Sequence, residues 1–284
     1  MKILLAVSGG PDSMCMADKF SRDNMGDGIA VAHCNFRLRG CESDSDEELV
    51  KHWAESHGIQ CFVTGFDTEG YAKEHGISIE MAARDLRYAW FAKIARENGF
   101  DAVAVAHNAD DNAETLLLNL LRGTGVRGAS GMRERGVLPG ASDILLLRPL
   151  LGMSRKDIDI YNNRYSVPFR IDSTNLETNY KRNKIRHMVM PVFSEINPSY
   201  LQTLSRDMEA FSEVSDIADE YFELKKQALL LPCRDGESVR INLSALCGSH
   251  HTKYLLFRLL EEYGFSYGDL DSICRLLESA KTVS

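Results

Sequence analysis

The residues most able to do chemistry lie near the start of the chain, in the hexapeptide Ser8-Gly9-Gly10-Pro11-Asp12-Ser13. Its two glycines let the backbone turn tightly and bring N–H groups close to a ligand, and its two serines add hydroxyl groups. The apolar run from Lys2 to Val7 predicts a buried strand before the turn, and the apolar spacing over 13–20 predicts a helix after it. A glycine-rich turn that opens into a helix N-terminus favours binding of an anion such as phosphate.

Two common phosphate loops do not fit this turn. A Walker loop ends in Gly-Lys-Ser or Gly-Lys-Thr, and residues 3–18 contain no lysine. A Rossmann loop has a third glycine and holds a dinucleotide along the sheet. The turn instead resembles the PP-loop, Ser-Gly-Gly-x-Asp-Ser, of the ATP pyrophosphatases. These enzymes split ATP into AMP and pyrophosphate while they activate a substrate oxygen as its adenylate.

A second polar group follows the strand predicted over 101–106. His107 stands at the end of that strand, and three acids open the next helix: Asp110, Asp111 and Glu114. A helix N-terminus favours acidic caps, but caps account for one acid and not for three. Carboxylates at the carboxyl end of a strand could hold Mg²⁺ on phosphates or receive the ammonium group of a cationic substrate.

Two further positions follow from the same predicted sheet. His33 ends the second predicted strand, where an adenine or ribose would lie if the phosphates occupied 8–13. Arg84 and Arg87 are three residues apart in the helix predicted over 78–98 and therefore share a face. Surface arginines are usually solvated, but beside a triphosphate a guanidinium could neutralise departing pyrophosphate.

Apolar runs and helical patterns alternate along most of the chain. The predicted strands are 2–7, 29–33, 61–64, 101–106 and 144–147, and the predicted helices between them are 42–57, 78–98 and 110–122. This alternation predicts an α/β fold with a doubly wound, mainly parallel sheet, whose ligands sit at the carboxyl ends of the strands. After Asn197 and Pro198 the pattern is helical. We therefore expect a catalytic domain over 1–195 and a small all-α domain over 196–284.

Charge and composition narrow the class of protein. The formal net charge is −8, yet residues 115–190 hold 13 Lys and Arg against 6 Asp and Glu. A basic segment in an acidic chain favours a polyanionic partner. The sequence has no run of 18 apolar residues and no basic leader, which predicts a cytoplasmic protein without membrane contact. Its seven cysteines include no Cys-x-x-Cys pair and are expected to be reduced.

Several later motifs, in register with the hexapeptide, resemble the tRNA(Ile)-lysidine synthase family over about residues 1–195. They are His33 to Gly40, Glu80 to Tyr88, Ala106 to Gly125, Arg148 to Leu151, Asp172 to Asn175 and Tyr180 to Arg186. The resemblance implies adenylation of the C2 oxygen of the wobble cytidine in an isoleucine tRNA with a CAU anticodon. Free lysine then displaces AMP through its side-chain amine and forms lysidine.

The resemblance also implies roles for particular side chains. The expected ATP-binding residues are Ser8, Gly9, Gly10, Pro11, Asp12, Ser13, His33, Arg84 and His107. The expected catalytic residues are Asp12, Arg87, Asp111 and Glu114; Asp111 and Glu114 would hold the lysine ammonium group, and Arg87 would position tRNA or the adenylate. Asp12 and Asp111 are expected to share Mg²⁺. Binding of tRNA is expected at Arg122, Lys181, Arg182 and Arg186, and a homodimer is left open.

The chain departs from the family pattern at two positions. Phe36 stands where members commonly have the last histidine of His-x-Asn-His, and Asn108 stands where they have the second of Ala-His-His. Three other functions stay open. They are a PP-loop tRNA thiolase, which would use cysteines or an iron–sulfur cluster, a PP-loop enzyme with a small-molecule substrate, and an RNA-binding module without catalysis.

Overall fold

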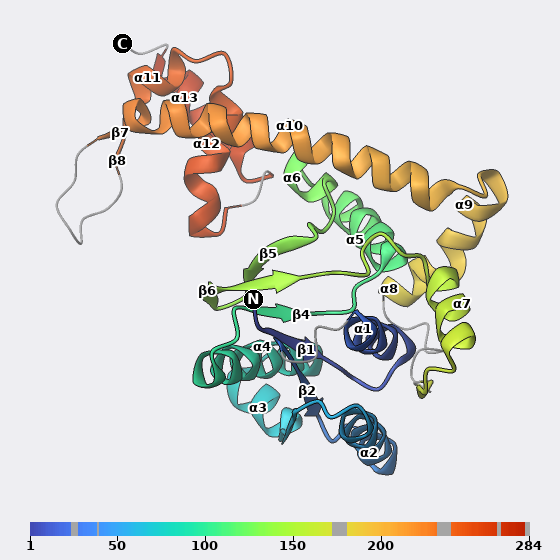
Figure 1. Cartoon of the computed structure of the whole chain (residues 1–284). Helices are drawn as coiled ribbons and strands as arrows, with labels where there is room; N and C mark the ends of the chain where they lie inside the picture. Colours follow the sequence, from blue (N-terminus) through green and yellow to red (C-terminus); the bar gives the residue numbers. More distant parts are fainter. Residues whose placement is uncertain (24–27, 39, 172–180, 232–239, 266–267, 282–284) are drawn as a thin grey trace. The chain divides into compact units, whose positions relative to one another are not determined.

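The computed structural model describes residues 1–23, 28–38, 40–171, 181–231, 240–265 and 268–281 (Figure 1). Two compact units divide the chain. The first consists of Met1–Thr115 and Met132–Ser205, and the second of Leu116–Gly131 and Arg206–Ser284. The predicted domain boundary lies at 195/196, whereas the second unit begins at Arg206 and also includes the internal segment Leu116–Gly131. Among the described residues, no helix combines the length and apolar character needed to cross a membrane.

A six-stranded sheet lies at the centre of the first unit (Figure 1). Its strands are β1 (Ile3–Ala6), β2 (Ile29–Asn35), β3 (Cys61–Gly65), β4 (Ala102–Ala104), β5 (Arg135–Leu138) and β6 (Ala141–Leu147). The order is β3-β2-β1-β4-β6-β5, and only β5 runs antiparallel to its neighbour. The predicted doubly wound, mainly parallel sheet is confirmed. The antiparallel edge strand β5 was not predicted.

Strand β1 lies at the point where the strand order reverses. It pairs with β2 on one side and with β4 on the other, so the chain leaves it in opposite directions. In open α/β sheets, the crevice for a ligand forms at this switch point, beyond the carboxyl ends of the strands. The hexapeptide 8–13 follows β1 directly and therefore occupies that position.

Alternating side chains of the strands build a core on each face of the sheet. On one face, Ile3, Leu5 and Val31 pack with buried residues of α1 (Pro11–Arg22), α2 (Cys41–Ser56) and α7 (Arg155–Tyr165). On the other face, Leu4 and Ala32 pack with α4 (Ile79–Asn98), and the shorter α3 (Thr68–His75) precedes α4 in the chain. Successive side chains of a strand point to opposite faces of the sheet, so only every second residue of a strand can face the site.

Helix ends are fixed by local chemistry. Ser78 caps α4 by accepting a hydrogen bond from the Met81 backbone N–H at 3.2 Å. Ser154 and Asp157 form a capping box at the start of α7. Both arrangements satisfy backbone donors that a helix start leaves free. The remaining elements of the first unit are the N-terminal part of α5 (Ala109–Arg122), α8 (Lys181–Lys184), a π-helical turn (Ile185–Val189), α9 (Met190–Ile196) and the start of α10 (Tyr200–Leu229).

The second unit is mostly helical around its own apolar core. It contains the rest of α5 and α10, with α6 (Val126–Ala129), α11 (Leu243–Cys247), α12 (Thr252–Leu260), a 3₁₀ turn (Glu261–Tyr263) and α13 (Leu270–Lys281). The core gathers Phe222, Leu229, Leu246, Leu255, Leu256, Leu259 and Leu270. Within the helical pattern that follows Pro198, α11 and α12 are two separate helices. A two-residue pairing of β7 (Leu230–Leu231) with β8 (Arg240–Ile241) corrects the all-α prediction, because the strand pattern is too short to read.

Candidate functional site

The hexapeptide forms a tight turn between β1 and α1. Gly9 has φ of 89°, a left-handed conformation that side chains rarely adopt. A Cβ at Gly9 would also lie 3.3 Å from the Cβ of Asp46. Gly10 is the N-cap residue of α1, and Pro11 occupies the first turn, where its missing N–H costs nothing. The backbone path of the turn therefore requires glycine at position 9 and is compatible with proline at position 11.

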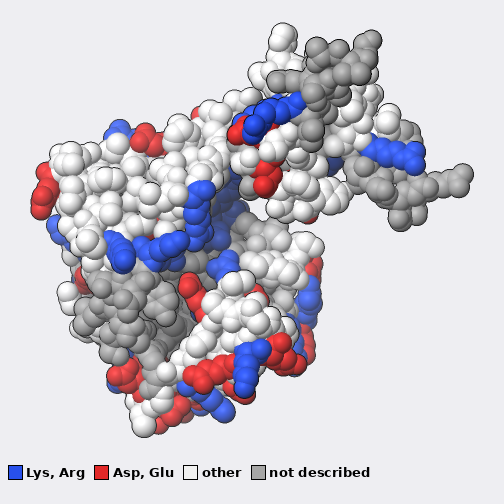
Figure 2. Space-filling view, turned by 180° about the vertical axis from the view of Figure 1, so that it is seen from behind, with Lys and Arg blue, Asp and Glu red and all other residues white. Residues whose placement is uncertain are grey.

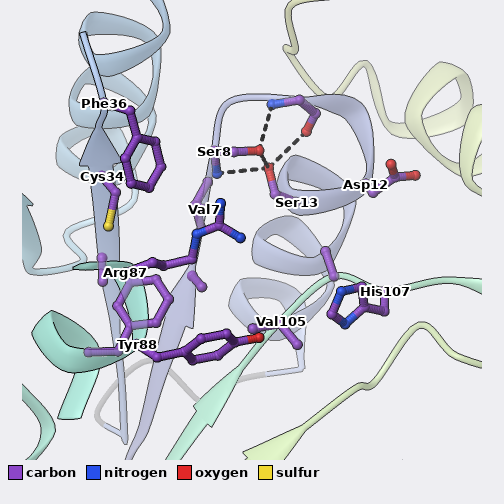
Figure 3. A pocket seen from close by; sticks show the side chains of 15 residues that line it. Val7, Ser8, Asp12, Ser13, Cys34, Phe36, Arg87, Tyr88, Val105 and His107 are labelled. Carbon is purple, nitrogen blue, oxygen red and sulfur yellow. Dashed lines mark hydrogen bonds between the residues drawn. The ribbon is translucent and has the colours of Figure 1, made fainter. Parts of the chain in front are cut away.

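Two hydroxyl groups hold the turn in shape (Figure 3). The Oγ of Ser13 accepts a hydrogen bond from the Ser8 backbone N–H at 3.1 Å and donates one to the Gly10 carbonyl at 2.9 Å. It also lies 3.1 Å from the Oγ of Ser8. The loop is ordered by its own groups before any ligand binds.

A pocket of about 320 Å³ opens beside this turn. Its apolar lining includes Ala6, Ala32, Cys34, Phe36, Phe91 and Val105, and its polar lining includes Ser8, Asp12, Ser13, Arg87 and His107. In Figure 3 the guanidinium of Arg87 extends from α4 into the space between Phe36 and His107. The pocket thus joins an apolar wall suited to a base with a polar floor suited to phosphates.

Some residues predicted to bind ATP are not part of the lining. Gly9 and Pro11 shape the turn, and Arg84 is exposed with its guanidinium 5.0 Å from the ring centre of Tyr88. His33 is 2% exposed, and its Nδ1 lies 2.8 Å from the Val7 carbonyl. Along β2, Ala32 and Cys34 line the pocket, so His33 between them points to the opposite face of the sheet. Burial lowers the pKa of His33, which keeps the ring neutral.

Phe36 belongs to an aromatic group that walls one end of the pocket. Its ring stacks on Phe66 at 5.7 Å between centres, and Phe66 meets Trp90 edge to face at 6.5 Å. The guanidinium of Arg87 lies 5.2 Å from the ring centre of Phe36. Where family members commonly carry an imidazole, this chain has a flat apolar surface with a cation held over it.

His107 lines the pocket opposite Phe36 (Figure 3). Burial lowers its pKa to about 4, and the positive charges of Arg148, Arg182 and Arg84 act in the same direction. Its Nδ1 is buried and has no hydrogen-bond partner in the described part of the chain. The ring is therefore neutral near pH 7 and offers a hydrogen bond, not a positive charge, to a ligand.

Asn108 joins the two acids that were predicted to hold Mg²⁺. Its side-chain oxygen accepts a hydrogen bond from the Asp111 backbone N–H at 2.9 Å. The backbone N–H of Asn108 donates to an Asp111 carboxylate oxygen at 3.2 Å. This is a capping box at the start of α5. The Asn108 amide also donates to Asp12 at 3.2 Å. Asparagine replaces the family's histidine here as a better helix cap and as a bridge between the two acids.

Each predicted catalytic acid is paired with an arginine. Arg155 donates to Asp12 at 2.5 Å. Arg186 donates to Glu114 at 2.6 and 3.1 Å and to Asp111 at 3.2 Å. The Nε of Arg182 lies 3.3 Å from Glu114, and its Nη2 donates to the Thr115 hydroxyl at 2.8 Å. We call these three acids and three arginines the carboxylate–arginine cluster.

The pKa values of the acids reflect their burial. The Glu114 side chain is 0% exposed, and desolvation raises its pKa while the Arg186 guanidinium opposes that rise. Desolvation likewise raises the pKa of Asp12, Arg155 opposes it, and the nearby Asp111 adds to it. The two aspartates therefore repel one another, and a cation between them would relieve that repulsion.

The acids fit a divalent cation only together with a ligand. Among residues 1–23, 28–38, 40–171 and the later described segments, no group of three or more His, Cys, Asp or Glu is arranged to hold a metal ion. Mg²⁺ in nucleotide sites commonly takes one or two carboxylates and completes its shell with phosphates and water. Asp12 and Asp111 could supply two such carboxylates, since both contact Asn108 and Asp12 lines the PP-loop pocket.

The residues predicted to bind tRNA fall into two sets. Lys181 is exposed on α8, as is Lys184, which was not predicted to bind tRNA, whereas Arg182 and Arg186 contact the acids. Arg122 is exposed at the end of α5 in the second unit. Figure 2 shows Lys and Arg side chains close together on one face of the larger body. The predicted motif over 172–175 and Tyr180 lie outside the described residues.

Sequence reasoning missed two parts of the site. Arg155 was not assigned to the site, and it contacts Asp12 across 143 positions in the chain. Phe66 and Trp90, which support Phe36, were not singled out. No local pattern marks any of the three, because their partners are distant in sequence.

Comparisons with known proteins agree with this geometry. A family model described as a PP-loop domain matches residues 1–193, and a model described as the TilS substrate binding domain matches 234–283. Among solved structures, the U34-tRNA thiolase NcsA from Methanococcus maripaludis has a TM-score of 0.61 at 15% identity, covering 75% of this chain and 73% of that one. This likeness shows the fold alone.

Curated relatives named tRNA(Ile)-lysidine synthase match nearly the whole chain. The relative from Bacteroides thetaiotaomicron is 40% identical over 97% of this chain and 61% of its own length, so the chain spans about three fifths of that relative. The relative from Chlorobaculum tepidum is 37% identical over 98% of this chain and 83% of its own length. The chain therefore belongs to the tRNA(Ile)-lysidine synthase family.

Proposed function

We propose that this protein ligates lysine to C2 of the wobble cytidine in tRNA(Ile) with a CAU anticodon, at the expense of ATP. The reaction passes through an adenylated cytidine and releases AMP and pyrophosphate. One observation carries the proposal beyond family membership. An ordered PP-loop pocket lies directly beside a cluster of acids that can hold a cation, and the reaction needs both a triphosphate and an ammonium group.

In the first half-reaction, the cytidine O2 attacks the α-phosphorus of ATP and pyrophosphate leaves. Backbone N–H groups of the turn at Ser8 to Ser13 and the start of α1 would face the phosphates. The adenine would lie against the apolar wall that includes Cys34 and Phe36. Arg87, which enters the pocket between wall and floor, would neutralise charge on the phosphates or adenylate.

In the second half-reaction, the lysine side-chain amine attacks C2 and AMP leaves with the O2 atom. Asp111 and Glu114 would hold the ammonium group beside the pocket. The amine must lose a proton before it attacks. Neutral His107 is a weak base because of its low pKa, so we assign it a hydrogen bond to the nucleotide instead.

Mg²⁺ would be held by Asp12 and Asp111 together with phosphate oxygens. When bound, it would offset negative charge on the triphosphate. The chain's own contribution is to fix both acids through hydrogen bonds to Asn108, and Asp12 also lines the pocket. We also propose a cytoplasmic location, where tRNA is modified. A homodimer stays an open prediction.

The decisive experiment measures pyrophosphate release from ATP with a tRNA(Ile) transcript and each amino acid in turn. We expect lysine alone to complete turnover and mass spectrometry of the digested tRNA to show lysidine. Replacing the wobble cytidine with uridine is the matched control. Release without RNA would point to a small-molecule substrate, and RNA binding without pyrophosphate release would point to a non-catalytic module.

The thiolase alternative is less well supported by the pocket chemistry. Cys34 is the cysteine among the lining residues, and burial raises its pKa to about 12. A thiol that stays protonated near pH 7 is a poor nucleophile. Incorporation of sulfur from labelled sulfide into the tRNA would overturn the lysine assignment.

A further inference from the structure

The acids assigned to the substrate ammonium group already hold cations of the chain itself. Glu114 accepts two hydrogen bonds from Arg186, and Asp111 accepts one from the same guanidinium. A guanidinium and an ammonium group compete for the same carboxylate oxygens. While Arg186 stays where it is, its hydrogen bonds and its positive charge therefore oppose binding of the lysine ammonium group at Asp111 and Glu114.

The arginines are placed so that they can leave. Glu114 has no exposed side-chain surface, but the side chains of Arg186 and Arg182 are 36% and 43% exposed. Arg186 lies in the π-helical turn Ile185–Val189, a rare form of helix that is frequent at functional sites. The arginines thus cover a buried acid from the solvent side.

Phosphate is the ligand that would draw them away. A guanidinium binds phosphate oxygens through two parallel hydrogen bonds, as it binds a carboxylate. Arg186 is also close to the pocket, because Asn108 contacts both Asp12 at the pocket and Asp111, the partner of Arg186. A triphosphate on the PP-loop or an RNA phosphate nearby offers such oxygens.

We propose that Arg186, supported by Arg182, keeps lysine out of Asp111 and Glu114 until phosphate oxygens take over its guanidinium. This inference rests on the proposed function and adds an order of events to it. Glu114 is too deeply buried to lose its partner without replacement, so departure of the arginine and arrival of the ammonium group are coupled. Lysine is then admitted only after the phosphates that the first half-reaction requires.

Coupling of this kind works in both directions. If phosphate raises the affinity for lysine, lysine must raise the affinity for phosphate by the same factor. Typical couplings between two sites lie in the range of roughly 5–150-fold. We expect a factor of at least about tenfold here, because one buried acid has to exchange one cation for another.

The test is lysine binding to the full chain by titration calorimetry at constant Mg²⁺. Four arms are compared: no addition, α,β-methylene-ATP, a tRNA(Ile) transcript, and both together. Tight lysine binding only in the arms that contain phosphate supports the proposal. Tight binding with α,β-methylene-ATP alone identifies the triphosphate as the source of the phosphate oxygens, and tight binding with the transcript alone identifies the RNA. Equal lysine affinity in all four arms overturns it.

A variant separates this role from a purely structural one. Arg186→Gln should bind lysine without any phosphate and lose the difference between the arms. Arg96→Gln, which breaks the exposed pair with Asp143, is the matched control and should keep the difference. Lower lysine affinity of Arg186→Gln in every arm would contradict the proposal. If Arg186→Gln does not fold, Arg182→Gln is tested in its place, and the comparison of the four arms with the unaltered chain still decides whether the proposal holds.

Failure of this inference is distinguishable from failure of the proposed function. If the chain forms lysidine while lysine binds equally in all arms, the order of events is wrong and the function stands. If lysine binds in no arm and no lysidine forms, both are wrong.

Discussion

The PP-loop pocket and the carboxylate–arginine cluster lie side by side in the first unit and satisfy their polar groups differently. In the pocket, Ser8 and Ser13 order the loop by hydrogen bonds within it, and the Nδ1 of His107 is left without a partner in the described structure. In the cluster, Asp12, Asp111 and Glu114 each accept a hydrogen bond from an arginine.

This difference separates a part that is ready for its ligand from a part that must rearrange. A preformed loop binds phosphate without further ordering, so little affinity is lost to conformational entropy. The cluster has to exchange ion pairs before a substrate ammonium group can enter. Substitutions in the two parts should therefore affect different steps, and five predictions test this.

Asp12 belongs to both parts, and its substitution should have the largest effect. We expect Asp12→Asn to lower kcat for pyrophosphate release by roughly 100-fold or more, because one fixed charge beside the reacting phosphates is lost. Asp143→Asn, in an exposed pair with Arg96, is the control and should retain activity. Activity of Asp12→Asn within threefold of the unaltered chain would remove Asp12 from the site.

His107 should make stability depend on pH. Its pKa is lowered to about 4 from the ordinary value of 6.5, so the folded chain binds fewer protons than the unfolded chain between these values. Stability is then full above pH 6.5 and falls as the pH drops towards 4, by at most about 3 kcal/mol for this group. Urea unfolding of His107→Gln at pH 7 and pH 4.5 should show a smaller difference than the unaltered chain. An equal difference would contradict this, since His33 is present in both.

Ser13 tests whether the loop is ordered in advance. Ser13→Ala removes the acceptor for the Ser8 N–H and the donor to the Gly10 carbonyl. Each such bond contributes about 1 kcal/mol, so we expect KM for ATP to rise roughly tenfold. Ser56→Ala, which removes a comparable bond to the Trp53 carbonyl in α2, is the control. An unchanged KM would mean that a ligand, not the loop, sets the geometry.

Phe36 tests the apolar wall of the pocket. Phe36→Ala should raise KM for ATP by about 2- to 10-fold, the amount expected from loss of one aromatic contact, with little change in lysine binding. Phe36→His restores the residue common in the family and should keep most of the affinity. Nucleotide titrations with both variants would show whether a ring at this position is what matters; equal affinity of the alanine variant would show that it is not.

The smallest effect is expected for the exposed lysines of α8. Lys181→Ala combined with Lys184→Ala should weaken tRNA binding and reduce the slope of log affinity against log salt by about 1.4, if each lysine contacts one phosphate. Filter binding over a series of salt concentrations measures this. Lys93→Ala, on the exposed face of α4, should leave the slope unchanged. The same slope in the double variant would exclude these lysines from the RNA contact.

Local sequence patterns predicted most of the fold that positions the site. The strand, turn and helix around residues 2–20 follow from an apolar run, two glycines and helical spacing, all within a few residues of one another. The edge strand β5 and the helix α3 were missed. Both are short, and β5 exposes two of its four residues, so neither carries a strong periodic signal.

Predicted site residues were placed correctly where local sequence patterns alone fix their position. Ser8, Gly10 and Ser13 line the pocket because the turn itself places them there. His33 is at the predicted strand end but on the opposite face of the sheet, and the sequence alone does not reveal which face holds the pocket. Its role in ATP binding stays a prediction, as do the role of Arg84 in ATP binding and the role of Arg122 in tRNA binding.

The amino-acid sequence by itself determined the PP-loop, the main strands and helices around it, and the acids that follow β4. Hydrophobic period and turn chemistry act between near neighbours, so they can be read along the chain. Only the tertiary structure decided which charge meets which. Arg155 reaches Asp12 across 143 positions and Arg186 reaches Glu114 across 72, and such pairings depend on how the helices pack around the sheet.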